Sequence, residues 1–171
     1  MTQGSSVSWG RDTQSRGTMD VEQGARLKSV IENLAVFRWL TIPQAARILK
    51  LCEQRRYRVG MTVYEEGSAS EEMLILLSGH LRAINCSGTV LGEIHPGDTT
   101  GEMSLLTGRI TRVATVIALE NSHGFTIGRS ELWAVLKSND ALRIKVLENM
   151  VDVLCQKIEG ANHQVETYAK K

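Results

Sequence analysis

One stretch of the chain, residues 101–116, combines residue types that suit a bound sugar phosphate. Gly101 and Glu102 open a run that we predict to be a single short helix, and Arg112 enters a β-type run after a loop. A glycine lets backbone N–H groups approach a ligand, and a helix N-terminus attracts negative charge. An arginine grips a phosphate with a bidentate fork, and an acid beside an anion makes sense if it accepts a hydrogen bond from a ribose hydroxyl. The stretch therefore predicts a site for a small anionic sugar phosphate.

The same residues also fit interpretations without a ligand, and the sequence leaves these open. Glu102 and Arg112 would form a structural ion pair if the domain binds nothing. Arg109 is either a second contact to the ligand or a solvated loop residue, and Arg82 faces either the ligand or solvent. Four apolar residues are candidates for the wall of a ligand pocket, although alternating strand residues ordinarily belong to the core: Leu74, Leu76, Leu91 and Val113.

The composition is that of a globular protein without bulk charge. Of 171 residues, 42% are hydrophobic and 23% are charged, and the formal net charge is +1. This balance gives no support to the electrostatic attraction on which non-specific nucleic-acid binding depends.

Membrane, secreted and metal-binding classes are not expected either. The longest apolar runs, such as residues 73–77, are far shorter than the roughly 20 residues of a membrane-spanning helix, and the polar N-terminus does not resemble a signal peptide. Cys52, Cys86 and Cys155 are widely spaced and odd in number, which indicates reduced thiols in a cytoplasmic protein. The four histidines share no metal-binding spacing, so no metal site is expected.

Two helices are predicted before the β-region. Residues 1–20 are polar and show no apolar periodicity, which predicts a flexible arm. Within residues 21–54, apolar spacings of three and four predict a helix over 21–39. Pro43 then opens a second, short helix that runs through Cys52.

Residues 55–136 change to short β-type runs separated by glycines. This frequency of strands and turns predicts an antiparallel β-roll or jelly roll of about eight strands, in an α+β fold. A short helix over 131–137 follows the last strand. The clearest predicted runs are 62–64, 73–77, 81–84, 90–91, 112–118 and 124–127.

Residues 137–171 predict a long final helix. One stripe recurs at spacings of three and four, which favours a two-helix coiled-coil seam and hence a homodimer: Ile144, Leu147, Val151, Leu154, Ile158, Ala161, Val165 and Tyr168. A second stripe of Val146, Met150 and Val153 is suited to packing back on the β-domain. A single amphipathic helix docked on its own domain fits the same pattern, so dimerisation and docking both stay open.

Several glycine-anchored motifs together resemble one family. They are Gly60-x-x-Val63-Tyr64-x-Glu66-Gly67, Leu74-Ile75-Leu76-Leu77-Ser78-Gly79, Pro96-Gly97-Asp98-x-x-Gly101-Glu102 and Arg112-x-Ala114-Thr115-Val116. Their order and intervals, over residues 37–136, are similar to those of the cyclic nucleotide-binding domain. The loop over 106–112 has the longer spacing of bacterial catabolite-activator-type regulators. The coincidence of several motifs is specific, whereas a lone Gly-Glu pair would be weak.

The resemblance implies a β-roll with flanking helices that binds cyclic AMP or cyclic GMP in a phosphate-binding cassette. It implies that Glu102 holds the ribose 2′-hydroxyl, that Arg112 holds the cyclic phosphate, and that backbone amides of Gly101, Glu102 and Met103 add to the cradle. The ligand-binding residues predicted in this way are Gly101, Glu102, Met103, Ser104, Arg109, Arg112, Val113 and Leu91.

The chain departs from the family pattern in three respects. Val113 lacks the hydroxyl that members often carry after the arginine, which favours cyclic AMP over cyclic GMP. Thr100 stands where a bulky apolar residue is usual. Catabolite-activator-type proteins continue into a helix-turn-helix DNA reader, and the about 35 residues after the roll cannot hold both that reader and a long helix, so direct DNA binding is not expected.

We therefore expect a cyclic nucleotide receptor that has no cofactor besides its ligand and signals through its C-terminal helix to a protein effector. No catalytic motif such as G-x-S-x-G or a Walker A loop occurs, so an enzyme is not expected. Three alternatives stay open. In the first, the pocket binds cyclic di-GMP, with Arg82, Arg109 and Arg129 on a second phosphate. In the second, the domain is a ligand-free interaction or dimerisation module. In the third, it is a regulatory subunit for a separate enzyme or transcription factor.

Overall fold

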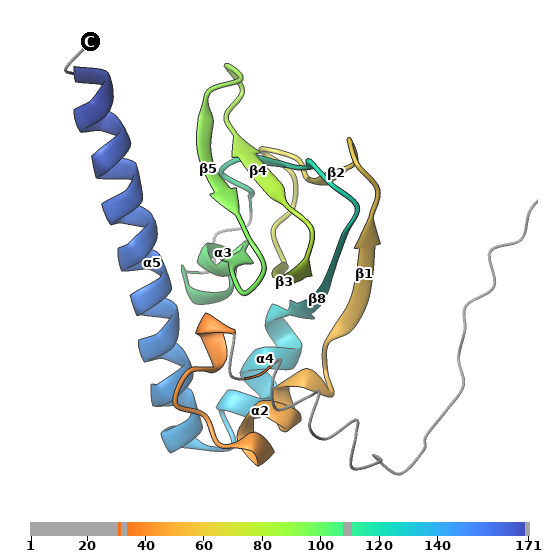
Figure 1. The fold of residues 1–171 in the computed structure, drawn as a ribbon. Coiled ribbons are helices and arrows are strands. Elements are labelled where there is room, and N and C mark those ends of the chain that lie inside the picture. The colour runs from red at the N-terminus through yellow and green to blue at the C-terminus, as the bar shows by residue number, and fades with distance from the viewer. Residues whose placement is uncertain (1–30, 32–33, 108–110, 170–171) are drawn as a thin grey trace, which may run out of the picture.

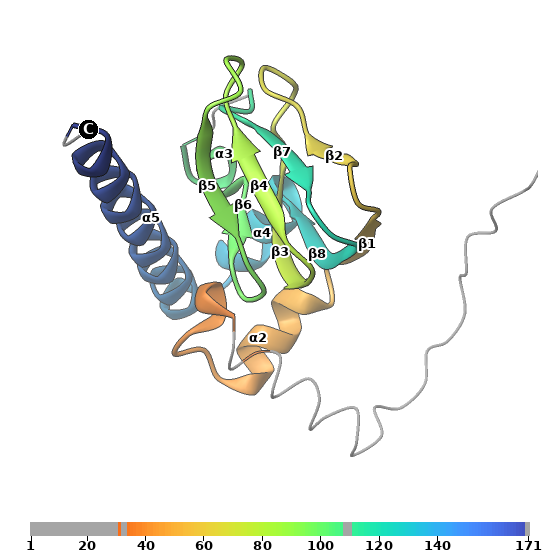
Figure 2. The same cartoon turned by 45° about the horizontal axis from the view of Figure 1, so that its top comes forward.

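The β-roll consists of two four-stranded antiparallel sheets packed against each other (Figures 1 and 2). The computed structural model of the protein describes residues 31, 34–107 and 111–169. One sheet has the strand order β1-β8-β3-β6 and the other β2-β7-β4-β5. The eight strands found in these residues confirm the predicted α+β roll: β1 (Glu53–Tyr57), β2 (Thr62–Tyr64), β3 (Glu72–Ser78), β4 (Leu81–Ile84), β5 (Val90–Ile94), β6 (Thr99–Thr100), β7 (Thr115–Ala118) and β8 (Ser122–Gly128).

Strand β3 is the centre of the molecule because it is buried on both faces. Successive side chains of a strand point to opposite sides, and here both sides are covered. Met73 and Ile75 pack with the helices, in a cluster that we call the helix-side core. Leu74 and Leu76 pack between the two sheets, in the inter-sheet core with Tyr64 and other apolar residues. The unbroken apolar run 73–77 is thus explained by two cores that share one strand.

The structure differs from the predicted strands most clearly at three places, while β5 and β8 are only longer than the predicted runs 90–91 and 124–127. Neither β1, which begins before the predicted start of the roll at residue 55, nor the two-residue β6 was predicted. The predicted run 112–118 is wrong at its start, because β7 begins at Thr115. Arg112 lies in the preceding loop, where its N–H donates to Ser68 and its carbonyl accepts from Gly67. The backbone of Arg112 is therefore tied to a turn and not to a neighbouring strand.

The predicted helix over 21–39 lies mostly outside the described residues, and its end is wrong. Leu34 is extended and is followed by a single 3₁₀ turn, η1 (Ala35–Phe37). Trp39 has a φ of 64°, in the left-handed region that ends helices. The side-chain amide of Asn149 donates to the carbonyls of Val36 and Arg38, at 3.1 and 2.5 Å, which fixes this irregular segment against the last helix. The predicted arm over 1–20 also lies outside the described residues.

Helices cover one end of the roll and one of its sides (Figure 1). Helix α2 (Ile42–Leu49) begins as predicted, with Thr41 in a capping box and Pro43 in the first turn. Its predicted end at Cys52 is wrong, since the helix stops at Leu49. Between β6 and β7, α3 (Glu102–Thr107) is the predicted short helix. After the last strand, α4 (Arg129–Leu136) starts two residues before the predicted 131.

The long helix α5 (Asp140–Ala169) runs along the side of the roll (Figures 1 and 2). Its buried residues in the described part of the chain lie between Leu142 and Val153. Val146, Met150 and Val153 are buried against the domain, as the second stripe predicted, and Leu142 is buried with them. Four residues of the heptad stripe, Ile144, Val151, Ile158 and Val165, are each more than half exposed. The docking of the helix on its own domain is therefore observed, while the homodimer stays a prediction. Among the described residues, no helix is both long and apolar enough to span a membrane.

Candidate functional site

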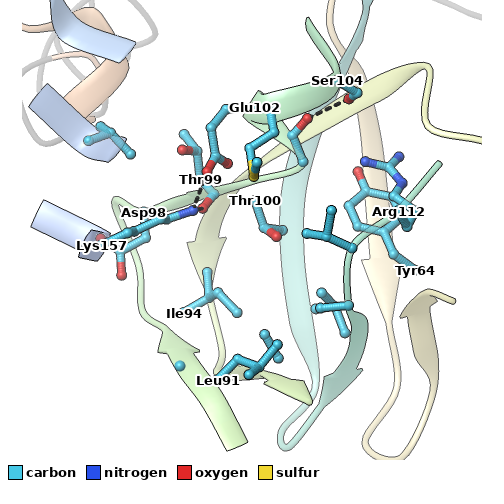
Figure 3. A pocket seen from close by; sticks show the side chains of 18 of the residues that line it. Tyr64, Leu91, Ile94, Asp98, Thr99, Thr100, Glu102, Ser104, Arg112 and Lys157 are labelled. Carbon is cyan, nitrogen blue, oxygen red and sulfur yellow. Dashed lines mark hydrogen bonds and ion pairs between the residues drawn. The ribbon is translucent and has the colours of Figure 1, made fainter. Parts of the chain in front are cut away.

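A cavity of about 440 Å³ lies between the roll, α3 and α5 (Figure 3). Strands β2, β4, β5 and β7 supply one wall, and α5 supplies another through Val153, Gln156 and Lys157. All of the predicted ligand-binding residues in the described part of the chain line it: Gly101, Glu102, Met103, Ser104, Arg112, Val113 and Leu91. Arg109, the remaining one, lies outside the described residues.

Gly101 is needed for the entry into α3. Its φ is +87°, a conformation that other residues adopt only with strain. A Cβ at this position would also lie too close to the guanidinium of Arg112 and to the carbonyl of Glu72. The hydroxyl of Ser104 donates to the Gly101 carbonyl at 2.6 Å, which holds the turn before the helix. The glycine therefore allows the arginine to pack directly beneath the cassette backbone.

Arg112 is buried and held by the roll. Its Nη1 donates to the carbonyl of Glu72 at 2.8 Å, and its guanidinium stacks on the ring of Tyr64 at 3.5 Å from the centroid. Its Nε is buried and has no hydrogen-bond partner within the described chain. Burial raises the pKa of the Tyr64 phenol, and the neighbouring Arg112 partly offsets that rise. The phenol therefore stays neutral beneath the guanidinium.

Glu102 is buried at the other end of the cavity, only 4% exposed. One carboxylate oxygen, Oε1, accepts from Lys157 Nζ of α5 at 2.7 Å, and Nζ also donates to the carbonyl of Thr99 at 2.8 Å. The second oxygen, Oε2, is buried without a hydrogen-bond partner among the described residues. The ion-pair partner of Glu102 in this part of the chain is thus Lys157, so the alternative of a Glu102–Arg112 ion pair is wrong.

Lys157 is the functional candidate that the sequence analysis missed. It follows Val153 by four positions, and so continues the buried stripe of Val146, Met150 and Val153 toward the C-terminus. A lysine at the end of an apolar stripe is ordinarily read as a solvated residue. Only the packing of α5 beside α3 reveals that it meets the cassette (Figure 3).

The apolar wall candidates divide between the cavity and the core. Leu91 and Val113 line the cavity and are about half exposed, at 44% and 47%. Leu74 and Leu76 lie in the inter-sheet core instead. Arg82 donates to Glu93 at 2.8 Å across the β4–β5 pair and is 40% exposed. No cluster of His, Cys, Asp and Glu that would hold a metal ion occurs in the described part of the chain.

Helix α3 is also fastened at its C-terminal end, to α4. Trp133 Nε1 donates to the carbonyl of Leu105 at 2.9 Å, and Arg129 Nη1 donates to the carbonyl of Ser104 at 3.4 Å. These two bonds occupy carbonyls that a short helix leaves unpaired. A displacement of α3 would therefore break these bonds or move α4 with it. Helix α4 in turn packs against α5.

The family model of the cyclic nucleotide-binding domain matches residues 54–139, half of the chain. The chain therefore belongs to the cyclic nucleotide-binding domain family, which confirms the resemblance seen in its motifs. Domains of this family are regulatory and non-catalytic.

Curated proteins match this chain over only a part of their own length. Glutaminase 2 of Bradyrhizobium diazoefficiens is 25% identical over 150 residues, which are 88% of this chain and 23% of that protein. The chain spans less than a quarter of the length of such curated relatives. The likeness therefore concerns a domain of these proteins and not their full length.

Two solved structures illustrate the similarity of fold. The cyclic nucleotide-binding domain from Methylobacillus flagellatus matches with a TM-score of 0.75 and 16% identity, covering 86% of this chain and 84% of that one. The c-di-GMP responsive global regulator CLP of Xanthomonas campestris matches with a TM-score of 0.66 and 22% identity, covering 75% and 65%. At these identities the likeness concerns the fold alone.

Proposed function

We propose that the protein is a cyclic nucleotide sensor that binds a 3′,5′-cyclic nucleotide in the cavity beside α5 and signals through that helix. The observation that carries this proposal is the placement of two buried groups of opposite charge, Arg112 and Glu102, at the two ends of one cavity (Figure 3). Membership of the cyclic nucleotide-binding domain family supports it further.

In this proposal Arg112 binds the cyclic phosphate and Glu102 accepts a hydrogen bond from the ribose 2′-hydroxyl. Backbone amides of Gly101, Glu102 and Met103 add to the phosphate cradle. Stacking on Tyr64 holds the guanidinium in place before the ligand arrives, which lowers the ordering cost of binding. The partnerless Nε of Arg112 is a donor that a phosphate oxygen would satisfy.

The size of the cavity supports a ligand of this class. A volume of about 440 Å³ falls within the roughly 300–1,000 Å³ of small-molecule sites. We propose cyclic AMP in preference to cyclic GMP, because Val113 carries no hydroxyl for the guanine amino group. The shared fold of CLP, which is c-di-GMP responsive, makes cyclic di-GMP the rival ligand to test.

Calorimetry with the three nucleotides in parallel tests the proposal. We expect saturable binding of cyclic AMP, weaker binding of cyclic GMP and none of cyclic di-GMP. Cyclic AMP at 100 times its dissociation constant should raise the free energy of unfolding by about 2.7 kcal/mol. If only cyclic di-GMP binds, the ligand is cyclic di-GMP and not cyclic AMP. If none of the three nucleotides binds, the remaining function is that of an interaction or dimerisation module.

For the signalling step, we propose that ligand occupancy changes how α5 packs on the roll, in a homodimer formed through the exposed heptad stripe. The stripe of Ile144, Val151, Ile158 and Val165 supports this, because a coiled-coil partner would cover it. Ile158→Glu should shift the protein from dimer to monomer in analytical ultracentrifugation while cyclic AMP binding is kept. Identical hydrogen exchange over residues 130–160 with and without cyclic AMP would contradict the signalling step.

We further propose that the chain itself performs no catalysis and acts in the cytoplasm on a protein effector, which is an enzyme or a transcription factor. The regulatory character of the family supports the first point. Three free thiols support a reducing compartment, and burial raises the pKa of the Cys52 thiol to about 12, which keeps it unreactive. A pull-down with and without cyclic AMP, followed by identification of the retained protein, tests the effector.

A further inference from the structure

The contact between Lys157 and Glu102 joins two elements that are otherwise far apart in the sequence. Glu102 is the first residue of α3, and Lys157 lies on α5 four residues after Val153, which is buried on the domain. The carboxylate side chain is 5% exposed and the lysine side chain 41% exposed. The ammonium thus reaches from a helix surface into the roll, and it brings α5 to the end of the cavity opposite Arg112 (Figure 3).

The two oxygens of this carboxylate are not equivalent. Oε1 is occupied by Lys157, whose Nζ is in turn fixed by the carbonyl of Thr99. Oε2 is buried and has no hydrogen-bond partner within the described residues. A buried acceptor without a partner is costly, and a ligand hydroxyl would satisfy it. A carboxylate accepts bonds at both oxygens, so a hydroxyl can bind at Oε2 while Lys157 remains on Oε1.

The charges around the cavity give Lys157 a second effect. Three carboxylates line it, those of Glu93, Asp98 and Glu102, against the two cations Arg112 and Lys157. Glu93 is paired outside the cavity with Arg82. An anionic nucleotide would meet an excess of negative charge without Lys157, because the charge of Glu102 would then be uncompensated.

We propose that Lys157 is a positioning and specificity-determining residue: it fixes Glu102 so that Oε2 receives the sugar 2′-hydroxyl, and it compensates the carboxylate beside an anionic ligand. This inference rests on the proposed function, since it concerns a ligand with a ribose in this cavity. It follows that the carboxylate of Glu102 would bind the ligand hydroxyl through one oxygen and Lys157 of α5 through the other. Recognition of the sugar is therefore linked to the position of the helix.

The test compares two probes that differ by one oxygen, cyclic AMP and 2′-deoxy cyclic AMP, on the full chain by calorimetry. Lys157→Met should weaken cyclic AMP binding about tenfold, the range of one charge-assisted hydrogen bond, and 2′-deoxy cyclic AMP by no more than about threefold. The preference for the hydroxyl should therefore fall. Lys157→Arg, which keeps a donor and a charge, should restore most of that preference.

Lys145→Met is the matched control, because Lys145 lies on the same helix and donates to the carbonyl of Trp39, outside the cavity lining. It should leave the affinity for both probes unchanged. Thermal unfolding of each variant checks that the fold is kept. This control separates the loss of a lysine from the loss of the contact with Glu102.

Two results would overturn the inference while the proposed function stands. The first is a Lys157→Met protein that loses the same factor for both probes, which would leave only charge compensation and contradict the role of Lys157 in fixing Glu102 for the 2′-hydroxyl. The second is one that binds cyclic AMP more tightly, which would make Lys157 a competitor of the hydroxyl. A parent protein that binds neither probe would overturn the proposed function, and this inference with it.

Discussion

The two ends of the cavity are held by different parts of the molecule. At one end, Arg112 is fixed by Glu72 and Tyr64, both of which belong to the roll. At the other end, Glu102 is fixed by Lys157, which belongs to α5. In the proposed function, the first arrangement keeps the phosphate contact within the roll. The second depends on a helix whose residues 155–163 are exposed, so we propose that binding is communicated from this end.

The largest effect is expected at the end held by Arg112. Arg112→Ala should weaken cyclic AMP binding at least about 100-fold, because in the proposed complex Arg112 donates two charge-assisted hydrogen bonds to the phosphate, each worth about 1.5–3 kcal/mol. Calorimetry measures the loss, and circular dichroism checks the fold. Arg55→Ala, at an exposed arginine of β1 paired with Glu53, is the control and should bind normally. If the affinity of Arg112→Ala for cyclic AMP stays within threefold of the parent protein, the phosphate is bound elsewhere and not by Arg112.

At the end held by Glu102 and Lys157, we expect a smaller loss of affinity together with a change in the dynamics of α5. Glu102→Gln should weaken cyclic AMP binding about tenfold, since a neutral amide is a poorer acceptor than a carboxylate. It should also speed hydrogen exchange around Lys157 in the free protein, because the ion pair that fastens α5 is lost. Arg112→Ala should leave exchange in α5 unchanged. Equal exchange in the two variants would remove the difference between the two ends.

The close approach of the cassette backbone to Arg112 can be tested at its glycine. Gly101→Ala should lower the free energy of unfolding by more than about 1–2 kcal/mol, the cost of a left-handed conformation in a residue with a Cβ. Gly88 has a similar φ of +80° but open space around it, so Gly88→Ala should cost the conformational part alone. Urea denaturation of both variants measures the difference. Equal losses would mean that Arg112 does not depend on the missing Cβ.

The smallest effect is expected where α3 meets α4. Trp133→Phe removes the hydrogen bond to the Leu105 carbonyl and should lower the free energy of unfolding by about 1 kcal/mol. Thermal or urea unfolding measures the change. Because α3 carries Glu102 at its first residue, cyclic AMP binding should weaken slightly while the packing of Arg112 on Tyr64 persists. A loss of affinity as large as that of Arg112→Ala would contradict this ranking.

The sequence predicted what is local and missed what depends on packing. The cassette residues Gly101 to Ser104 are contiguous, and their glycine and acid carry a recognisable pattern. Lys157 joins Glu102 across 55 positions, and no spacing in the sequence indicates such a contact. The contact between the ring of Tyr64 and the guanidinium of Arg112 also joins residues far apart in the sequence, and no spacing indicates it. Tyr64 belongs to a strand of only three residues.

The errors in the fold have similar causes. The helical spacing over 21–39 predicted a helix to its end, but Asn149 of α5 binds the carbonyls of this segment and holds it irregular. Strand β6 has two residues and exists because Thr99 and Thr100 pair with β3. Short strands of this kind are created by their neighbours and have no periodicity of their own.

The double burial of β3 has a consequence for how the protein melts. Because the inter-sheet core and the helix-side core share this one strand, neither can come apart while the other stays intact. Heating should therefore give a single cooperative transition, with equal calorimetric and van't Hoff enthalpies. The strand also carries Glu72, the anchor of Arg112. A bound nucleotide should accordingly shift that whole transition upward, without a separate step for the roll.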